Sequence, residues 1–205
     1  MERIATGFGF TEGPAWSPDG FLVFSDLGSP VGNRVIKLNA DGTTEDFLKP
    51  SGGANGLLFD RRGNLYICQG GVDASGNRYR CGGMCRRVSK LSRDGELVVL
   101  ADAFNTRRLN SPNGLAFDGV GGIYFTDPRY FTLENLEQEV MGGYYLAPTG
   151  NILRVVSEIC VPNGILVSND GTRLYVADTT EVRQELPAGM EKIHARVISE
   201  VAATP

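Results

Sequence analysis

A two-residue motif recurs along the chain, and its period constrains the fold more than any other feature of the sequence. The motif is Glu or Asn followed by Gly, and its copies begin 43, 58 and 50 residues apart. The four copies are Glu12-Gly13, Asn55-Gly56, Asn113-Gly114 and Asn163-Gly164. A strand-like stretch, a turn sequence containing Gly and a second strand-like stretch follow each copy. A period of this size is typical of architectures in which one supersecondary unit is repeated.

The second stretch of each copy is rich in β-branched and aromatic residues, which favour β-strands. These predicted strands span residues 21–26, 65–69, 123–127 and 174–178, and the strands predicted after them span 35–38, 88–91 and 143–146. Each of the first three copies therefore predicts an antiparallel four-stranded meander. Repeated meanders are the signature of a β-propeller, and 27 glycines with ten prolines leave little room for long helices. We expect an all-β fold, an incomplete propeller of about four blades.

Composition excludes several classes of function. The 205 residues carry a formal charge of −4 and no long cluster of Lys and Arg, so nucleic acid is not an expected partner. No apolar run is long enough to cross a membrane, and we expect no membrane partner. Residues 1–7 lack the apolar core of a secretory signal, which predicts a cytoplasmic protein.

Polar residues open each copy and end its second strand, and both sets are predicted to lie on one face. Glu12, Asn55, Asn113 and Asn163 open the copies; Asp26, Gln69, Asp127 and Asp178 end the second strands. A strand, a turn and a returning strand bring both ends to the same side. First strands of propeller blades are innermost, so the opening side chains are expected to converge. Their oxygens suit Ca²⁺, Mg²⁺ or Mn²⁺; the alternative is that Asn and Gly simply form turns.

Three further features carry expectations of their own. Arg107 and Arg108 present guanidinium groups suited to binding the hydroxyls or carboxylate of a sugar acid, and the alternative is a pair of solvated loop arginines. Trp16 is expected to pack in the core between blades. Residues 181–203 have an apolar spacing nearer to that of an amphipathic helix than to that of a strand.

Longer motifs around these positions resemble one known family. They are FTEGPAW at residues 10–16, RRLNSPNGL at 107–115, YFTDPRY at 124–130 and VPNGI at 161–165. Together they are similar to the SMP-30/gluconolactonase (LRE-like) family of six-bladed β-propellers, and most similar to its bacterial gluconolactonase-like branch. The resemblance runs from about residue 8 to residue 178 within a single domain over 1–205, and it leaves 179–205 as a divergent tail.

The resemblance implies a hydrolase of sugar-type lactones that uses one divalent cation. Ca²⁺ is expected first, with Mg²⁺, Mn²⁺ or Zn²⁺ as other candidates. By motif, Glu12 and Asn163 match the family's metal ligands. Asn113 matches the residue that contacts substrate or metal-bound water, so we assign it to both the metal and the substrate, together with Arg108 on the substrate. The cation would polarise the lactone carbonyl and lower the pKa of a bound water.

Departures from the family pattern open an alternative function. The family's later metal-binding Asp, in a Pro-Asp-Gly motif, has no counterpart before Pro205, which predicts a C-terminally truncated propeller. Asp178 is then the nearest remaining carboxylate and the candidate catalytic base, unless it makes only a local turn hydrogen bond. The family's Ser-Pro-Asn-Asp also ends in Gly114 here. The alternative is a non-catalytic binding scaffold or an inactive fragment, whose open sheet edge would favour oligomerisation.

Overall fold

The computed structural model describes residues 3–28, 33–71, 85–130, 136–179 and 195–199, and the regular secondary structure of these residues is entirely β-strand. No helix in this part of the chain is therefore long and apolar enough to cross a bilayer. The chain divides into two compact units, Met1–Asp102 and Ala103–Pro205. Each unit is built from antiparallel sheets whose strands follow one another in chain order.

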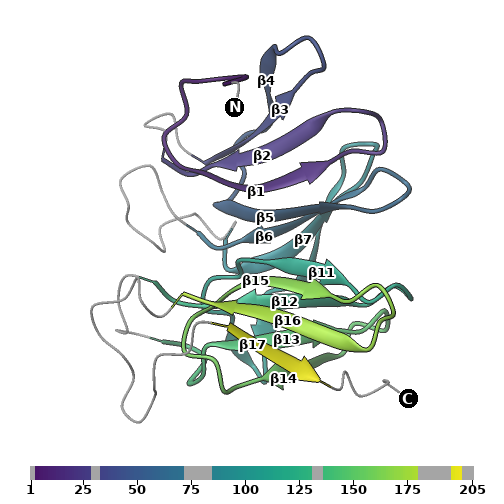
Figure 1. The fold of residues 1–205 in the computed structure, drawn as a ribbon. Helices are drawn as coiled ribbons and strands as arrows, with labels where there is room; N and C mark the ends of the chain where they lie inside the picture. Colours follow the sequence, from purple (N-terminus) through teal and green to yellow (C-terminus); the bar gives the residue numbers. More distant parts are fainter. Residues whose placement is uncertain (1–2, 29–32, 72–84, 131–135, 180–194, 200–205) are drawn as a thin grey trace. The chain divides into compact units, whose positions relative to one another are not determined.

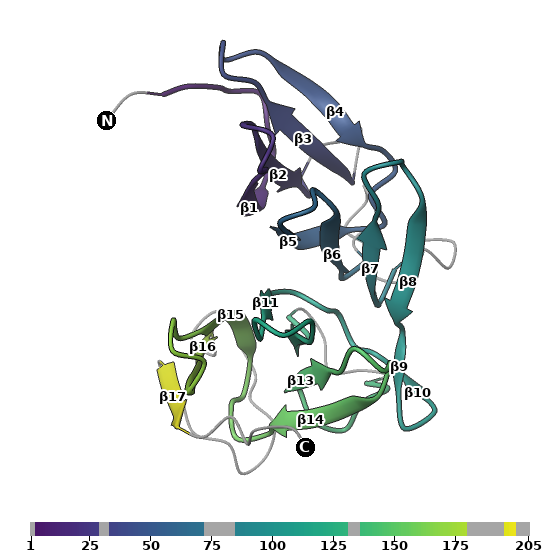
Figure 2. The same ribbon diagram turned by 90° about the vertical axis from the view of Figure 1, so that its right-hand side faces the viewer.

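Unit 1 contains two four-stranded sheets (Figure 1). The first consists of β1 (Thr11–Trp16), β2 (Leu22–Asp26), β3 (Arg34–Leu38) and β4 (Thr44–Leu48). The second consists of β5 (Ala54–Phe59), β6 (Leu65–Gln69), β7 (Arg87–Leu91) and β8 (Leu97–Ala101). The two sheets meet through their opening strands, since β1 lies beside β5 (Figure 2).

Unit 2 contains a four-stranded sheet, a three-stranded sheet and a short hairpin. The four-stranded sheet consists of β11 (Leu115–Phe117), β12 (Ile123–Asp127), β13 (Gly142–Leu146) and β14 (Ile152–Val156). The three-stranded sheet consists of β15 (Pro162–Val167), β16 (Arg173–Asp178) and β17 (Ala195–Ser199). The hairpin is β9 (Ala103–Phe104) with β10 (Arg107–Arg108). Strand β15 lies beside both β11 and β12.

The predicted all-β class and the predicted meanders are confirmed. The expected second strands agree to within one residue with β2, β6, β12 and β16, and the expected third strands agree equally well with β3, β7 and β13. The turns between them follow the sequence signals. In the first turn, Gly20 adopts a φ of +86° and donates its N–H to the carbonyl of Ser17 at 3.0 Å, a conformation that a residue with a Cβ rarely adopts.

Each unit has its own hydrophobic core. The core of unit 1 joins its two sheets and consists of Ala15, Val23, Val35, Ala54, Leu57, Leu65 and Ile67. The core of unit 2 also joins two sheets and consists of Tyr124, Tyr145, Val156, Ile159, Leu174 and Val176. Both are the cores of stacked β-sheets, in which alternate residues of each strand point into the space between sheets.

Two expectations from the sequence are wrong. Trp16 is 66% exposed rather than part of the core, because its neighbour Ala15 takes the inward position and successive strand residues point to opposite faces. Residues 195–199 form strand β17, which pairs along β16, and not a helix. Backbone pairing with β16 therefore overrides the helical spacing of the apolar residues in this part of the tail. Residues 180–194 and 200–205 lie outside the described residues.

Candidate active site

Three of the four Glu/Asn-Gly motifs lie at β-bulges in the opening strands. In β1, Glu12 pairs with Ser25 and Ala15 with Val23, so three steps along β1 face two along β2. Strands β5 and β15 shift register in the same way, between Ala54 and Leu57 and between Pro162 and Ile165. A bulge inserts one residue, bends the strand and re-aims its side chain, and bulges are frequent beside active sites. The repeated motif thus marks a repeated distortion that periodicity alone does not predict.

The fourth motif, Asn113-Gly114, lies directly before β11 and is held by Thr126 of β12. The Asn113 N–H donates to the Thr126 carbonyl at 2.9 Å, and the Thr126 N–H donates to the Gly114 carbonyl at 3.0 Å. The Thr126 hydroxyl also accepts the Gly114 N–H at 2.9 Å. The backbone that carries the Asn113 side chain is therefore fixed at several points.

The opening side chains themselves are not used to hold the fold. Glu12 and Asn163 are half-buried, and Asn113 is 5% exposed. Within the ranges that the structure describes, none of these three side chains makes a hydrogen bond or ion pair. Buried or half-buried polar groups normally have a partner, so these oxygens are positioned on a fixed backbone with their lone pairs available.

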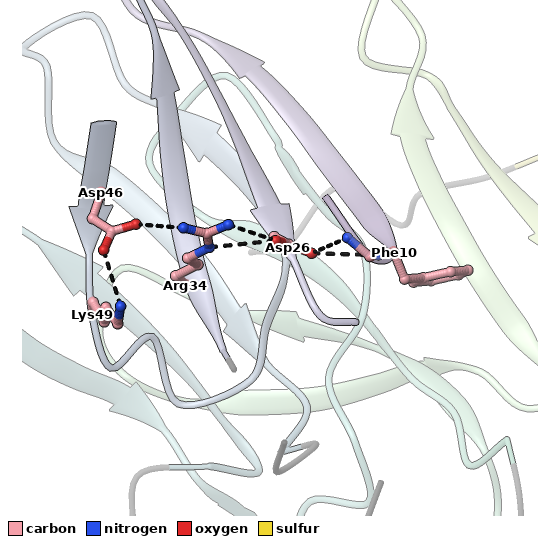
Figure 3. A network of polar contacts seen from close by, with 6 residues as sticks. Phe10, Asp26, Arg34, Asp46 and Lys49 are labelled. Carbon is pink, nitrogen blue, oxygen red and sulfur yellow. Dashed lines mark hydrogen bonds and ion pairs between the residues drawn. The ribbon is translucent and has the colours of Figure 1, made fainter. Parts of the chain in front are cut away.

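The residues that end the second strands behave in the opposite way, as Asp26 illustrates (Figure 3). This fully buried carboxylate accepts the N–H groups of Gly9 and Phe10 at 3.0 and 3.3 Å. On its other side it pairs with the Arg34 guanidinium at 3.1 Å, which also contacts Asp46 at 3.1 Å. Asp26 therefore ties the segment leading into β1 to strand β3.

Gln69, Asp127 and Asp178 occupy the equivalent position in the other three sheets, and all three are buried and bonded. The Gln69 amide donates to the Ser51 carbonyl at 2.8 Å. The Asp127 carboxylate accepts the N–H groups of Asn110 and Ser111 at 2.7 and 2.6 Å. Asp178 accepts the Val161 N–H at 3.1 Å. The four closing residues therefore fasten the segment before the opening strand of their own sheet.

In this geometry Asp178 binds the backbone of its own sheet, a role that the sequence alone did not distinguish from that of a catalytic base. Its carboxylate is 8% exposed and holds the backbone just before Pro162 and Asn163. Asp26 and Asp127 hold the corresponding backbone in their sheets in the same manner. Asp178 is therefore a positioning residue for the Asn163 segment, and its assignment as the catalytic base stays a prediction.

The hairpin that carries Arg107 and Arg108 is fastened by Gln138, which the sequence analysis missed. The buried Gln138 amide lies 2.8 and 3.2 Å from the carbonyls of Arg107 and Arg108 and 3.0 Å from that of Phe104. The Asn110 side chain accepts the Gln138 N–H at 3.2 Å. An amide group buried against three carbonyls has no sequence signature, because its partners are assembled only by the fold.

The two arginines differ in their surroundings. Arg107 is exposed and pairs with the Glu139 carboxylate at 2.9 Å, which matches the alternative of a solvated loop arginine. Arg108 is half-buried at the end of the hairpin, two residues before Asn110. Of the two, Arg108 is the less exposed, and it is nearer in sequence to Asn110, where the segment bound by Asp127 begins.

Burial and the nearby charge of Asp127 also change the pKa of a tyrosine of β13. Burial, reinforced by the negative charge of Asp127, raises the pKa of Tyr144 to about 12. Tyr144 packs against Phe104 and Phe125, with ring centroids 5.1 and 5.4 Å away. Its hydroxyl is therefore neutral at any physiological pH, and Tyr144 serves as part of the aromatic support under the hairpin.

The predicted site residues are divided between the units. Unit 1 contains Glu12; unit 2 contains Arg108, Asn113, Asn163 and Asp178. In unit 2 the structure brings the Asn113 and Asn163 segments together: a Cβ built on Gly114 would lie 2.7 Å from the Asn163 carbonyl oxygen. In unit 1 the Glu12 segment lies in the same way against Asn55, because a Cβ on Gly13 would collide with the Asn55 carbonyl.

The chain is similar to known sequences. The sequence profile of the family described as SMP-30/Gluconolactonase/LRE-like region matches residues 10–185. Gluconolactonase from Zymomonas mobilis subsp. mobilis is 32% identical over 199 residues, covering 87% of this chain and 51% of that protein. Lactonase drp35 from Staphylococcus aureus (strain MW2) is 39% identical over 165 residues, covering 62% and 48%. The chain thus spans about half the length of these curated relatives.

Solved structures share the fold. A gluconolactonase from Xanthomonas campestris superposes with a TM-score of 0.74 at 28% identity, covering 96% of this chain and 60% of that one. Virginiamycin B lyase from Staphylococcus aureus superposes with a TM-score of 0.55 at 15% identity, covering 86% and 50%, a likeness of fold alone. The expected propeller-type fold is confirmed by these neighbours.

Proposed function

Because the chain belongs to the SMP-30/Gluconolactonase/LRE-like family, we propose that it hydrolyses a sugar-type lactone with the help of one divalent cation. The names of the similar proteins from Zymomonas mobilis and Xanthomonas campestris support lactone hydrolysis at the level of the family. In this reaction water adds to the lactone carbonyl and the ring ester C–O bond breaks. The product is the open hydroxy acid.

One observation carries the assignment of residues. The closing side chains of the four sheets are all bonded within the fold, whereas the opening side chains Glu12, Asn113 and Asn163 make no described hydrogen bond or ion pair. Turn formation alone would not require oxygen-bearing side chains that make no described hydrogen bond. Ligand binding explains why they are oriented but not used by the fold.

The chemistry of these donors fits a divalent cation. Glu12 supplies a carboxylate, and Asn163 and Asn113 supply amide oxygens, which are hard ligands of the kind that Ca²⁺, Mg²⁺ and Mn²⁺ prefer. Ca²⁺ is the first candidate because it accepts neutral amide oxygens and irregular geometry. When bound, such an ion supplies polarisation of a carbonyl and a lowered pKa for water.

The remaining roles belong to the chain itself. Asn113 offers an amide whose NH₂ group donates to a lactone oxygen, on a backbone held by Thr126. Arg108 offers a guanidinium fork for hydroxyl groups of the substrate. The buried clamps Asp127 and Gln138 restrict the segment between these two residues before substrate arrives, which lowers the entropic cost of binding.

The test is a paired measurement on the 205-residue chain. Thermal unfolding is followed after chelation and then with millimolar Ca²⁺, and hydrolysis of gluconolactone is followed in the same samples. We expect Ca²⁺ to raise the melting temperature and to support turnover, since a ligand that binds only the folded state stabilises it. Glu12→Gln is expected to abolish both responses.

Glu45→Gln is the matched control, because it makes the same chemical change on exposed strand β4, where Glu45 pairs with Lys37 at 2.8 Å. It should retain the Ca²⁺ response and the turnover. If both variants behave alike, Glu12 is not a ligand. A wild-type protein whose melting temperature ignores Ca²⁺, Mg²⁺, Mn²⁺ and Zn²⁺ and which turns over no lactone would instead favour the non-catalytic scaffold.

A further inference from the structure

Thr126 makes contacts that join two segments of the proposed site. It is fully buried in β12, directly before Asp127. Its hydroxyl accepts the Gly114 N–H at 2.9 Å and donates to the Asn163 carbonyl at 2.6 Å. A hydroxyl has a single hydrogen to donate and lone pairs to accept with, so this one side chain is bonded to both Asn-Gly segments at once.

The two segments approach each other closely at Gly114, where the Thr126 hydroxyl bridges them. At Gly114 a Cβ would lie 2.7 Å from the Asn163 carbonyl oxygen, closer than real Cβ atoms come. The absence of a side chain at Gly114 lets the Asn163 backbone come within reach of Thr126. The glycine and the hydroxyl therefore act together, one allowing the approach and the other fixing it.

Unit 1 has a similar arrangement, in which a hydroxyl and a closely approaching glycine meet one carbonyl. The Ser25 hydroxyl donates to the Asn55 carbonyl at 2.8 Å, beside the close approach of Gly13 to the same carbonyl. The equivalent position in the other two sheets holds Cys68 and Ala177. A strand at this position therefore forms without a hydroxyl, and the hydroxyl of Thr126 is not a general requirement of the meander.

We propose that Thr126 is a positioning residue that sets the register between the Asn113 and Asn163 side chains. This inference rests on the function proposed above, in which Asn163 binds the cation and Asn113 contacts the substrate. With the hydroxyl present, both backbones are bonded to one buried atom, and their side chains keep a fixed separation. Without it, the Asn163 carbonyl loses its donor and the separation is no longer set. A misplacement of about 1 Å costs on the order of 100-fold in rate.

The experiment compares Thr126→Ala with Thr126→Ser. Alanine removes the hydroxyl without placing a methyl group against the Asn163 carbonyl, and serine restores the hydroxyl. The half-saturating Ca²⁺ concentration is read from melting temperatures, and kcat and KM for gluconolactone are measured separately at saturating Ca²⁺. We expect Thr126→Ala to raise the half-saturating concentration and to lower kcat, each by about ten-fold, while Thr126→Ser stays within about two-fold of wild type.

Ser89→Ala is the control for the loss of a buried hydroxyl as such. Ser89 is fully buried in β7 and donates to the Gln69 side chain at 2.6 Å, in unit 1. This variant should lower the melting temperature and leave the Ca²⁺ half-saturation and kcat unchanged. Should Thr126→Ala fail to fold, Thr126→Cys keeps a weaker donor at the position and must shift both quantities in the same direction.

The outcomes separate this inference from the function on which it rests. Wild-type turnover and Ca²⁺ binding that survive unaltered in Thr126→Ala would overturn the positioning role and leave the lactonase proposal standing. A wild-type protein without Ca²⁺ response and without turnover would overturn both. Loss in Thr126→Ala with rescue in Thr126→Ser and no effect in Ser89→Ala supports the positioning role.

Discussion

At the scale of single residues, the two Asn-Gly motifs of unit 2 use their glycines differently. A Cβ on Gly114 would lie 2.7 Å from a backbone oxygen of Asn163, whereas the nearest atom to a Cβ on Gly164 is the Ala177 Cβ at 4.0 Å. A backbone atom cannot rotate away as a long side chain does. In this chain, a side chain at position 114 therefore requires the Asn163 backbone to shift.

Gly114→Ala is expected to destabilise the protein by about 1–3 kcal/mol, the usual cost of overpacking a close contact. Gly164→Ala, the matched change in the other motif, is expected to stay within about 0.5 kcal/mol of wild type, as surface substitutions do. Urea unfolding of the two variants measures both values. Equal stabilities would mean that the Asn163 backbone moves aside at no cost.

At the scale of elements, the ends of the second strands fasten each sheet to the segment that enters it. Asp26, Asp127 and Asp178 accept backbone N–H groups from 16 or 17 residues earlier in the chain. The sequence placed these residues correctly at strand ends and predicted that they share a face with the opening residues, but it did not predict that they bind this earlier backbone. Only hydrogen-bond partners distinguish the two sets, and those partners are set by how the strands fold back.

The contribution of such a closing residue to stability can be measured at Asp26. Asp26→Ala removes a buried partner of Arg34 and leaves two N–H groups without their acceptor (Figure 3). Breaking a buried pair from one side costs about 3–5 kcal/mol. Asp46→Ala removes the exposed partner of the same guanidinium and should cost at most about 1 kcal/mol.

Thermal and urea unfolding of the two variants provide the comparison. A similar loss in both would show that Arg34 is satisfied equally well from either side. In that case the segment at Gly9 and Phe10 would be held by something other than Asp26.

At the scale of the whole molecule, each of the two units has a hydrophobic core cluster of its own among the described residues. Ile67 is fully buried in the core of unit 1, and Leu174 is 2% exposed in the core of unit 2. Truncating either to Ala removes apolar contacts worth about 2–5 kcal/mol. Because each core is drawn from one unit, the resulting loss of structure should be local to that unit.

Hydrogen exchange resolved along the chain measures this directly. Ile67→Ala should raise exchange in the strands of Met1–Asp102, and Leu174→Ala in those of Ala103–Pro205. Equal increases in both units from either variant would indicate one cooperative structure. Oligomerisation through an open sheet edge and a cytoplasmic location stay predictions at this scale.

The sequence by itself determined the elements and the family. Strand formation depends mainly on local sequence, so turn glycines and β-branched stretches such as 65–69 and 123–127 located the predicted second and third strands to within a residue. Motifs such as Val161–Ile165 carried the family likeness without any knowledge of packing. The exposure of Trp16 was not predicted, because the neighbouring strands decide which face of a strand is buried. Strand β17 was not predicted either, because it depends on pairing with β16.

Only the tertiary structure decided which polar residues are available and which are used. Asn113 and Asp127 are both buried polar residues of similar size. Among the residues that the structure describes, the Asn113 side chain makes no hydrogen bond, whereas the Asp127 carboxylate accepts two backbone N–H groups. Thr126 and Gln138 matter through partners 28 to 37 residues away. Hydrogen bonds between segments so distant in the chain depend on atomic positions that form only when the sheets stack, and no local pattern of residues encodes them.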